Sequence, residues 1–191
     1  MQLPSRRYEE ITKIVIEMFK KFDVRNIPID CFEIALKMGV ILKPYSVLDG
    51  NSLIKALGIS DDGFCIFQPA GVGPFSFGQW YIFYNDSKPP KRIRFTLMHE
   101  IAHIVLDHTE PSDLAEAEAN FFAKYALAPP PLVHKVLPED YLELGSSFEL
   151  SNECAMYSFN YYKKWLRHGG ECYKEIELDL IDQFEMSEYI Q

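Results

Sequence analysis

The chain has 191 residues, of which 48% are hydrophobic and 25% are charged, and this composition excludes a disordered or fibrous protein. The formal net charge is −9, and most of it lies from residue 139 onward, where twelve Asp and Glu accompany four Lys and Arg. Such acidity disfavours direct nucleic-acid binding, which needs a basic surface. It could favour basic protein partners, although a solubilising surface explains it equally well.

Composition also bears on the cellular location. Residues 1–7 lack the apolar run of a signal peptide, and no apolar stretch is long enough to span a membrane. The four cysteines are scattered without a metal-binding spacing, which suits a reducing compartment. We therefore expect a cytoplasmic protein with no membrane partner.

The first ninety residues are predicted to form two helices followed by a small sheet. Apolar residues at helical spacing predict a helix over residues 8–22. Asp30 and Glu33 form a capping box that starts a second helix, which ends near Gly39. Alternating and apolar runs predict strands, and glycine and proline predict turns and loops between them. The strands are expected at 40–44, 63–67 and 80–84, and the turn and loop at 61–63 and 69–74.

A buried helix is predicted over residues 93–106, because this segment is apolar on nearly every side. It contains His99, Glu100 and His103. Histidines four residues apart lie on one face of a helix, where two imidazoles can bind one zinc ion. The glutamate between them can take a proton from the attacking water. A zinc site is favoured over two exposed histidines, since buried polar groups need partners.

The next helix carries two candidates for a third zinc ligand. It is predicted over residues 114–127, after a start at residues 109–112 with Pro111 near the first turn. Glu116 and Glu118 point about 200° apart around this helix, so only one can face the histidines. Periodicity leaves the choice open, and the other glutamate is expected to be a solvated charge.

The remainder of the chain is predicted to be mostly helical, with helices over residues 132–137 and 152–168. Ser151 is the expected N-cap of the longer helix, and Gly169 ends it. Residues 175–180 alternate acidic and apolar side chains, the period of a half-buried strand. A helix continuing through Phe184 and Met186, a segment packed elsewhere and a disordered acidic end are the alternatives.

Two motifs resemble the ImmA/IrrE family of zinc metallo-endopeptidases. Residues 94–103 read RFTLMHEIAH and residues 116–123 read EAEANFFA, and the family patterns are R-F-T-x-x-H-E-x-x-H and E-x-x-A-N-x-F-A. The chain departs from the family at Ala102, where glycine is common, and at residues 126–129, which read ALAP in place of LLMP. The resemblance is close from about residue 80 to 131 and looser toward the N-terminus.

The resemblance implies the site and the substrate. One zinc per chain would bind His99, His103 and Glu116, with Glu100 as the catalytic base. Asn120, one turn after Glu116, could hold a ligating histidine by its second nitrogen. Members of the family are linked to mobile genetic elements and cleave a helix-turn-helix transcriptional repressor, which is therefore the expected partner and substrate.

The expected fold is α+β, with zincin-like helices around a three-stranded sheet and a C-terminal helical module. The predicted domains are a peptidase domain at 1–131 and an acidic module at 132–191. The resemblance also implies that the strand at 80–84 is an edge strand that pairs with substrate, while its apolar run favours a core strand. The tail at 175–180, if a strand, could occupy that edge and restrain activity.

Further residues could line the cleft, and other functions are compatible with the sequence. Tyr84 or Tyr81 could lend a hydroxyl to the transition state, with plain packing as the favoured alternative. His108 could donate to the oxyanion, although a structural bond at the helix end is favoured. A metzincin site needs glycine and histidine where the chain has Leu106 and Thr109. A non-catalytic metal-containing module that controls a transcription factor or toxin, and a hydrolase of small amides, are the alternative functions.

Overall fold

The computed structural model describes residues 3–70, 77–170 and 172–185. It is an α+β protein with a small three-stranded sheet, as predicted. The chain divides into two compact units, Met1–Asp30 with Pro111–Gln191 and Cys31–Glu110, and each is described by itself. The two units are defined by contacts in space. The predicted functional domains, 1–131 and 132–191, are a different division and remain a prediction.

The sheet lies in the unit Cys31–Glu110, and its last strand in chain order lies in the middle. Its strands are β1 (Ile41–Pro44), β2 (Gly63–Ala70) and β3 (Phe77–Tyr84). The order is β1-β3-β2, with β1 parallel and β2 antiparallel to β3. Ile82 lies opposite both Leu42 and Cys65 and is fully buried.

This order corrects the prediction that the strand at 80–84 is an edge strand. Both backbone edges of β3 form ladders over residues 81–84, one with β1 and one with β2, so these residues have no open edge for a substrate strand. The alternative, a core strand buried on both faces, holds only in part: the strand is central in its pairing, but Ile82 alone among residues 80–84 is buried and the others are half-buried. The physical reason is the parallel strand β1, whose pairing partner cannot be read from local sequence.

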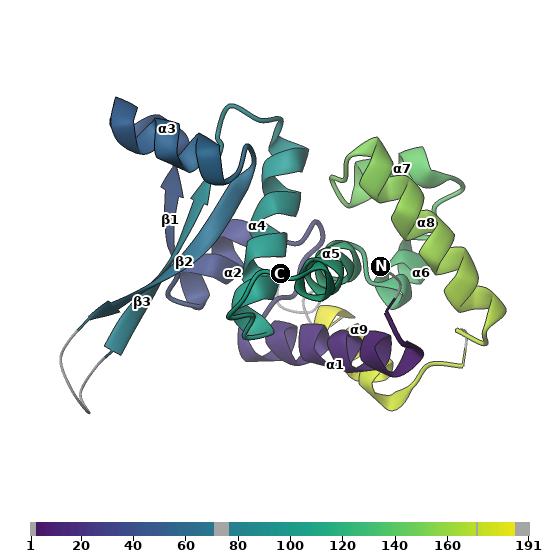
Figure 1. Cartoon of the computed structure of the whole chain (residues 1–191). Coiled ribbons are helices and arrows are strands. Elements are labelled where there is room, and N and C mark those ends of the chain that lie inside the picture. The colour runs from purple at the N-terminus through teal and green to yellow at the C-terminus, as the bar shows by residue number, and fades with distance from the viewer. Residues whose placement is uncertain (1–2, 71–76, 171, 186–191) are drawn as a thin grey trace. The chain divides into compact units, whose positions relative to one another are not determined.

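The helices of this unit flank the sheet. They are α2 (Cys31–Lys37), the short 3-10 helix η1 (Tyr45–Val47), α3 (Gly50–Ile59) and α4 (Pro90–Val105). Helix α4 packs against β2 and β3, and α2 packs against α4 and β1, on the same side of the sheet (Figure 1). Leu97, Met98 and Ile101 are fully buried, which confirms the predicted burial of α4.

Helix α3 was not predicted. Its N-cap, Asp49, accepts hydrogen bonds from the backbone N–H groups of Asn51 and Ser52, both at 3.0 Å. Ile54 and Ile59 on this helix are 71% and 65% exposed, so its apolar residues do not mark a buried face. The predicted loop at 69–74 begins inside β2, which extends to Ala70, and its other residues lie outside the described part of the chain.

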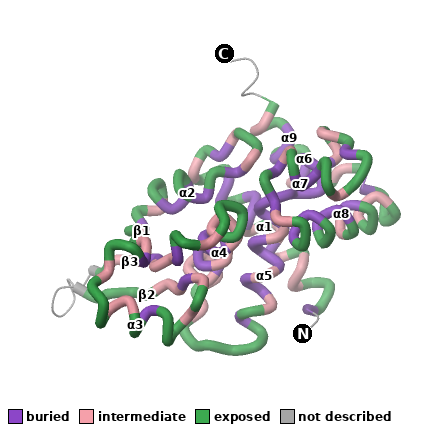
Figure 2. Tube along the Cα trace, turned by 90° about the horizontal axis from the view of Figure 1, so that it is seen from above, coloured by how far each residue is buried: buried purple, intermediate pink, exposed green. Residues whose placement is uncertain are grey.

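The unit Met1–Asp30 with Pro111–Gln191 is helical in its described residues. Its helices are α1 (Ser5–Lys21), α5 (Asp113–Leu127), α6 (Pro130–Val136), α7 (Tyr141–Ser147), α8 (Asn152–Arg167) and α9 (Glu175–Glu185). Helix α1 packs on α5 and α9, and α8 packs on α5, α6 and α7. Buried and exposed stretches alternate along α1 and α8 (Figure 2), as expected for helices with one face on a core.

Helix α9 corrects the prediction of a strand at residues 175–180. Leu180 and Ile181 are buried, and the Gln183 side chain donates to the carbonyl oxygens of Phe19 at 2.9 Å and Val24 at 2.7 Å. The tail is therefore part of the core around α1 and does not have the form of a strand that could add to a sheet. The helical alternative holds through Phe184, because burial follows a three- and four-residue step along the tail rather than alternation. Its other named residue, Met186, lies outside the described part of the chain.

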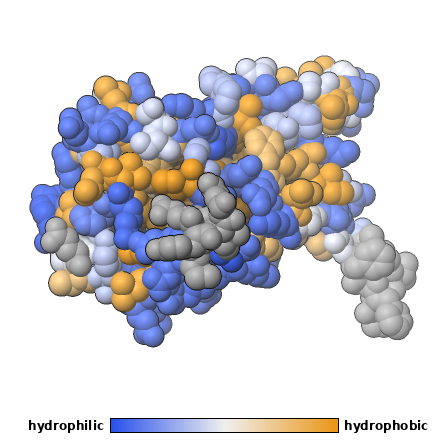
Figure 3. All heavy atoms as spheres, turned by 180° about the vertical axis from the view of Figure 1, so that it is seen from behind, coloured by the Kyte–Doolittle hydropathy of each residue, from blue (hydrophilic) through white to orange (hydrophobic). Residues whose placement is uncertain are grey.

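Within the described residues, no helix is both long and apolar enough to cross a membrane. One face of the molecule carries hydrophobic side chains among hydrophilic ones (Figure 3). Scattered apolar residues of this kind are normal on protein surfaces.

Candidate metal centre

Two histidines on α4 face each other across one helical turn. The Nε2 atoms of His99 and His103 lie 3.1 Å apart, and their rings are inclined by 70° with centroids 4.8 Å apart. In a tetrahedral zinc site with zinc–nitrogen bonds of about 2.0–2.1 Å, two ligating nitrogens lie roughly 3.4 Å apart. The pair therefore has the spacing that one zinc ion requires.

The environment of His99 favours its neutral form. Burial lowers the pKa of His99 to about 4, and positive charge at His108 and Arg92 acts in the same direction, whereas Asp62 opposes it. An imidazole binds a metal only when it is unprotonated. His99 is therefore in its ligating form at neutral pH.

Glu100 lies between the histidines and is 7% exposed. Tyr45 is 2% exposed, and burial first, then the negative charge of Glu100, raise the pKa of Tyr45 to about 12. The Tyr45 hydroxyl donates to the carbonyl oxygen of Ser60 at 3.0 Å. No sequence pattern indicated this tyrosine, because it comes from η1, more than fifty residues before Glu100.

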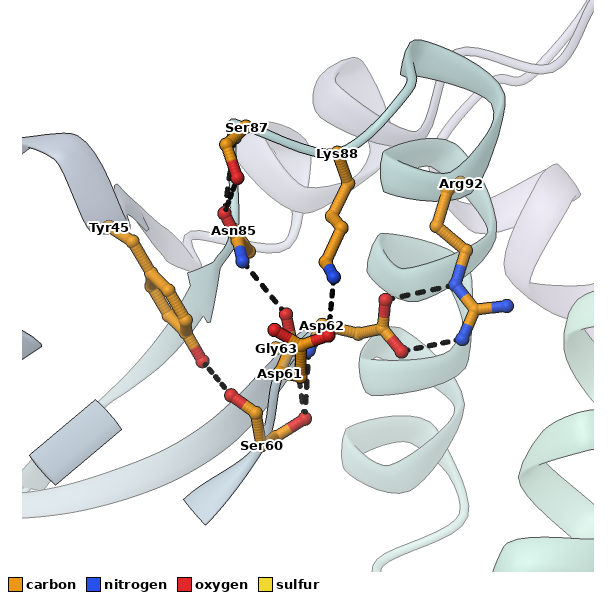
Figure 4. Close-up of polar contacts among 9 residues, drawn as sticks. All are labelled: Tyr45, Ser60, Asp61, Asp62, Gly63, Asn85, Ser87, Lys88 and Arg92. Carbon is orange, nitrogen blue, oxygen red and sulfur yellow. Dashed lines mark hydrogen bonds and ion pairs between the residues drawn. The ribbon is translucent and has the colours of Figure 1, made fainter. Parts of the chain in front are cut away.

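A polar network ties the start of α4 to the start of β2 (Figure 4). The Asp62 carboxylate accepts two hydrogen bonds from Arg92, from Nε at 2.9 Å and from Nη2 at 2.5 Å, and this lowers the pKa of Asp62. Lys88 pairs with Asp61, and the Asn85 amide donates to the Asp61 carbonyl oxygen at 2.9 Å. These bonds hold the first turn of the helix that carries the histidines.

Gly63, in the same network, allows β2 to lie close to α4. A Cβ atom there would lie 2.7 Å from both the Phe83 carbonyl oxygen and the Thr96 Cγ2 atom. Both distances are well below van der Waals contact. From the sequence, Gly63 is expected to end a turn and to start a strand, and nothing in the local pattern indicates its close contact with α4.

His108 lies against His103 after the end of α4. Their Nδ1 atoms are 3.0 Å apart. The structural bond favoured from the sequence is therefore present, and its partner is one of the two α4 histidines. A donation from His108 to the oxyanion stays a prediction.

The two candidate glutamates on α5 differ in their surroundings. Helix α5 starts at the N-cap Ser112, whose hydroxyl accepts from the Ala115 N–H at 3.1 Å. Glu118 is 6% exposed, and its two carboxylate oxygens accept from Arg7, from Nε at 2.7 Å and from Nη2 at 2.6 Å. Glu116 is exposed. Glu118 is therefore a buried ion-paired residue, and the expectation of a solvated charge does not hold for it.

His99, His103 and Glu116 form a group that could hold a metal ion, with one ligand atom of each within 4.8 Å of the others. Among the described residues, this is the one group of three such side chains that could hold a metal ion. Two imidazole nitrogens and one carboxylate oxygen are the donor set of catalytic zinc sites.

The other predicted cleft residues have structural contacts. The Asn120 amide donates to the Glu116 carbonyl oxygen at 2.7 Å. The Tyr84 ring packs edge-on against Phe32 with centroids 5.9 Å apart, and burial raises the pKa of Tyr84. A bond from Asn120 to a ligating histidine and a catalytic role of Tyr84 stay predictions.

A peptidase family model, described as the IrrE N-terminal-like domain, matches residues 60–159. The match spans more than half of the chain and includes both α4 and α5. The chain therefore belongs to this family, which confirms the ImmA/IrrE resemblance. No curated protein matches the chain. Membership supports a metallopeptidase-type function, and together with the His99, His103 and Glu116 group it suggests a metal cofactor.

Proposed function

We propose that the chain is a zinc-dependent endopeptidase. The observation that carries the proposal is the pair of α4 imidazoles, His99 and His103, which flank Glu100 in the sequence and whose Nε2 atoms lie 3.1 Å apart, in a member of a peptidase family. One zinc would bind His99, His103 and Glu116. Glu118 is the weaker candidate because Arg7 already occupies both of its carboxylate oxygens.

The reaction would be hydrolysis of a peptide bond. Zinc, when bound, supplies a Lewis acid that polarises the scissile carbonyl. Glu100 takes a proton from the attacking water as general base and passes it to the leaving amine as general acid. The burial of Glu100 keeps bulk water from competing for that carboxylate. The two histidines would supply their Nε2 lone pairs to the metal.

We further propose a helix-turn-helix repressor of a mobile genetic element as the substrate. The support is the resemblance of residues 94–103 and 116–123 to the ImmA/IrrE motifs, together with membership of that family. The net charge of −9 agrees with a protein partner rather than direct nucleic-acid binding. Cleavage in the cytoplasm would relieve repression.

Co-expression with such a repressor, encoded next to the gene of this chain, tests the proposal. Intact-mass measurement of the repressor should show one specific cut with the wild-type chain and none with Glu100→Gln. An unrelated unfolded protein is the control and should stay largely intact. A repressor that binds the zinc-loaded wild-type chain but remains whole would overturn the peptidase proposal and favour a regulatory binding module.

A further inference from the structure

Helix α4 ends in a turn that folds the chain back toward His103. The Asp107 N–H donates to the Ile104 carbonyl oxygen at 3.3 Å, and the His108 N–H donates to the His103 carbonyl oxygen at 3.0 Å. Asp107 has a positive φ of 54°. These are the two hydrogen bonds and the left-handed residue of a Schellman motif. The motif fixes the backbone of His108 relative to that of His103.

The side chains of the two residues meet as a result. Their Nδ1 atoms lie 3.0 Å apart, their ring centroids lie 5.0 Å apart, and the rings are inclined by 70°. The other nitrogen of His103, Nε2, lies 3.1 Å from Nε2 of His99. The two nitrogens of His103 therefore face different neighbours.

The protons on this pair follow from the chemistry of ligation. A neutral imidazole carries one proton, and the other nitrogen is an acceptor. If His103 binds zinc through Nε2, its proton is on Nδ1. The nitrogen 3.0 Å away, Nδ1 of His108, must then accept that proton's hydrogen bond, and His108 carries its own proton on Nε2.

We propose that His108 is a positioning residue for the metal centre, accepting a hydrogen bond from Nδ1 of His103 and so fixing the tautomer and ring orientation in which His103 ligates zinc. The inference rests on the proposed zinc site and adds to it a residue outside the two family motifs. Ligating histidines usually donate to a carboxylate, a carbonyl oxygen or water. Here a second imidazole takes that place.

Zinc affinity of three variants, measured by competition with a chelator of known affinity, tests the role of His108. His108→Leu removes the acceptor and should weaken zinc binding about 10–100-fold. His108→Asn keeps an acceptor oxygen near the position of Nδ1 and should restore most of the affinity. The matched control is His168→Leu, because His168 also follows a helix end and bonds a backbone carbonyl, that of Lys164. It should bind zinc as the wild type does.

Zinc binding by His108→Leu within twofold of the wild type would overturn the inference, as would an Asn variant no better than Leu. If His108→Leu does not fold without metal, NMR of the wild-type protein tests the role of His108 instead. A coupling through the hydrogen bond between the Nδ1 atoms of His103 and His108 supports the role, and its absence overturns it. A wild-type protein that binds no zinc would instead contradict the proposed function, from which the inference starts.

Discussion

Substitution of Glu100 tests proton transfer without disturbing metal binding, because Glu100 lies between the two histidines in the sequence and is not an expected ligand. Glu100→Gln keeps the size of the side chain and removes the base. We expect the variant to hold as much zinc as the wild type and to cleave at least ~100-fold more slowly. Zinc content and initial rate, measured on the same preparation, check this, and an unchanged rate would show that another group is the base.

Glu116 and Glu118 should fail in different ways when truncated. Glu116→Ala removes an expected ligand from an exposed position, so zinc affinity should fall while the metal-free protein keeps its stability. Glu118→Ala removes the two shortest hydrogen bonds of Arg7 and leaves it only the 3.2 Å pair with Glu10, so it should lower the free energy of unfolding by about 1–3 kcal/mol. The lower half of that range is expected, since the Arg7 side chain is 30% exposed.

Chelator competition and chemical denaturation of both variants separate these effects. A larger loss of zinc affinity in Glu118→Ala than in Glu116→Ala would move the third ligand to Glu118.

At the level of single residues, the sequence could predict what a helix fixes by its own geometry. Spacing alone put His99 and His103 on one face, and the structure joins their Nε2 atoms at 3.1 Å. The bond between His103 and His108 depends instead on a left-handed residue. That residue is Asp107 and not the glycine that usually signals such a turn. The pair of Arg7 and Glu118, 111 positions apart, has no local signal at all.

At the level of elements, the contact between β2 and α4 should be sensitive to one methyl group. Gly63→Ala places a Cβ 2.7 Å from the Thr96 Cγ2 atom on α4 and 2.7 Å from the Phe83 carbonyl oxygen on β3, and the second is a backbone atom that cannot turn away. The free energy of unfolding should fall by about 1–3 kcal/mol. Gly58→Ala is the control, because nothing lies within 4 Å of the new Cβ and the site is in α3, so stability should rise by up to about 1 kcal/mol.

Thermal or urea unfolding of the two glycine variants measures the difference. Equal stability of both variants would show that β2 and α4 do not approach as closely as described.

Elements with a strong apolar period were predictable, and elements defined by distant partners were not. Helices α4, α5 and α8 lie where the sequence placed them, and Ser151 caps α8 as expected, accepting from the Cys154 N–H at 3.3 Å. Helix α3 exposes its apolar residues, so the pattern indicated no buried face. The central place of β3 depends on β1, which pairs with it across forty residues of chain.

At the level of the whole molecule, α9 should stabilise its unit rather than restrain activity. Deleting residues from Lys174 onward removes the buried Leu180 and Ile181 and both hydrogen bonds from Gln183. We expect a lower melting temperature and no gain in cleavage rate. A truncated protein that stays folded and cleaves faster would restore the restraint hypothesis.

A matched pair of point variants tests α9 without truncation. Leu180 is fully buried, whereas Leu178 is 46% exposed. Leu180→Ala should therefore cost about 2–5 kcal/mol, and Leu178→Ala should stay within about 0.5 kcal/mol of the wild type. Urea unfolding of both measures this, and equal effects would contradict the packing of α9.

The fold class and family could be read from the sequence because they depend on motifs within single helices. Two stretches, residues 94–103 and 116–123, were sufficient for the family, which the match over residues 60–159 confirms. The sheet order and the packing of the tail required contacts between distant segments. Those contacts form between segments that are far apart in the sequence, and no local pattern predicts them.

The central claim is that one zinc ion binds at His99, His103 and Glu116. Anomalous diffraction at the zinc edge, from crystals of the zinc-loaded protein, tests it directly. We predict one strong peak per chain within about 2.0–2.2 Å of both Nε2 atoms and of a Glu116 carboxylate oxygen. No peak between the histidines, or a peak bound by Glu118 instead of Glu116, would contradict the account.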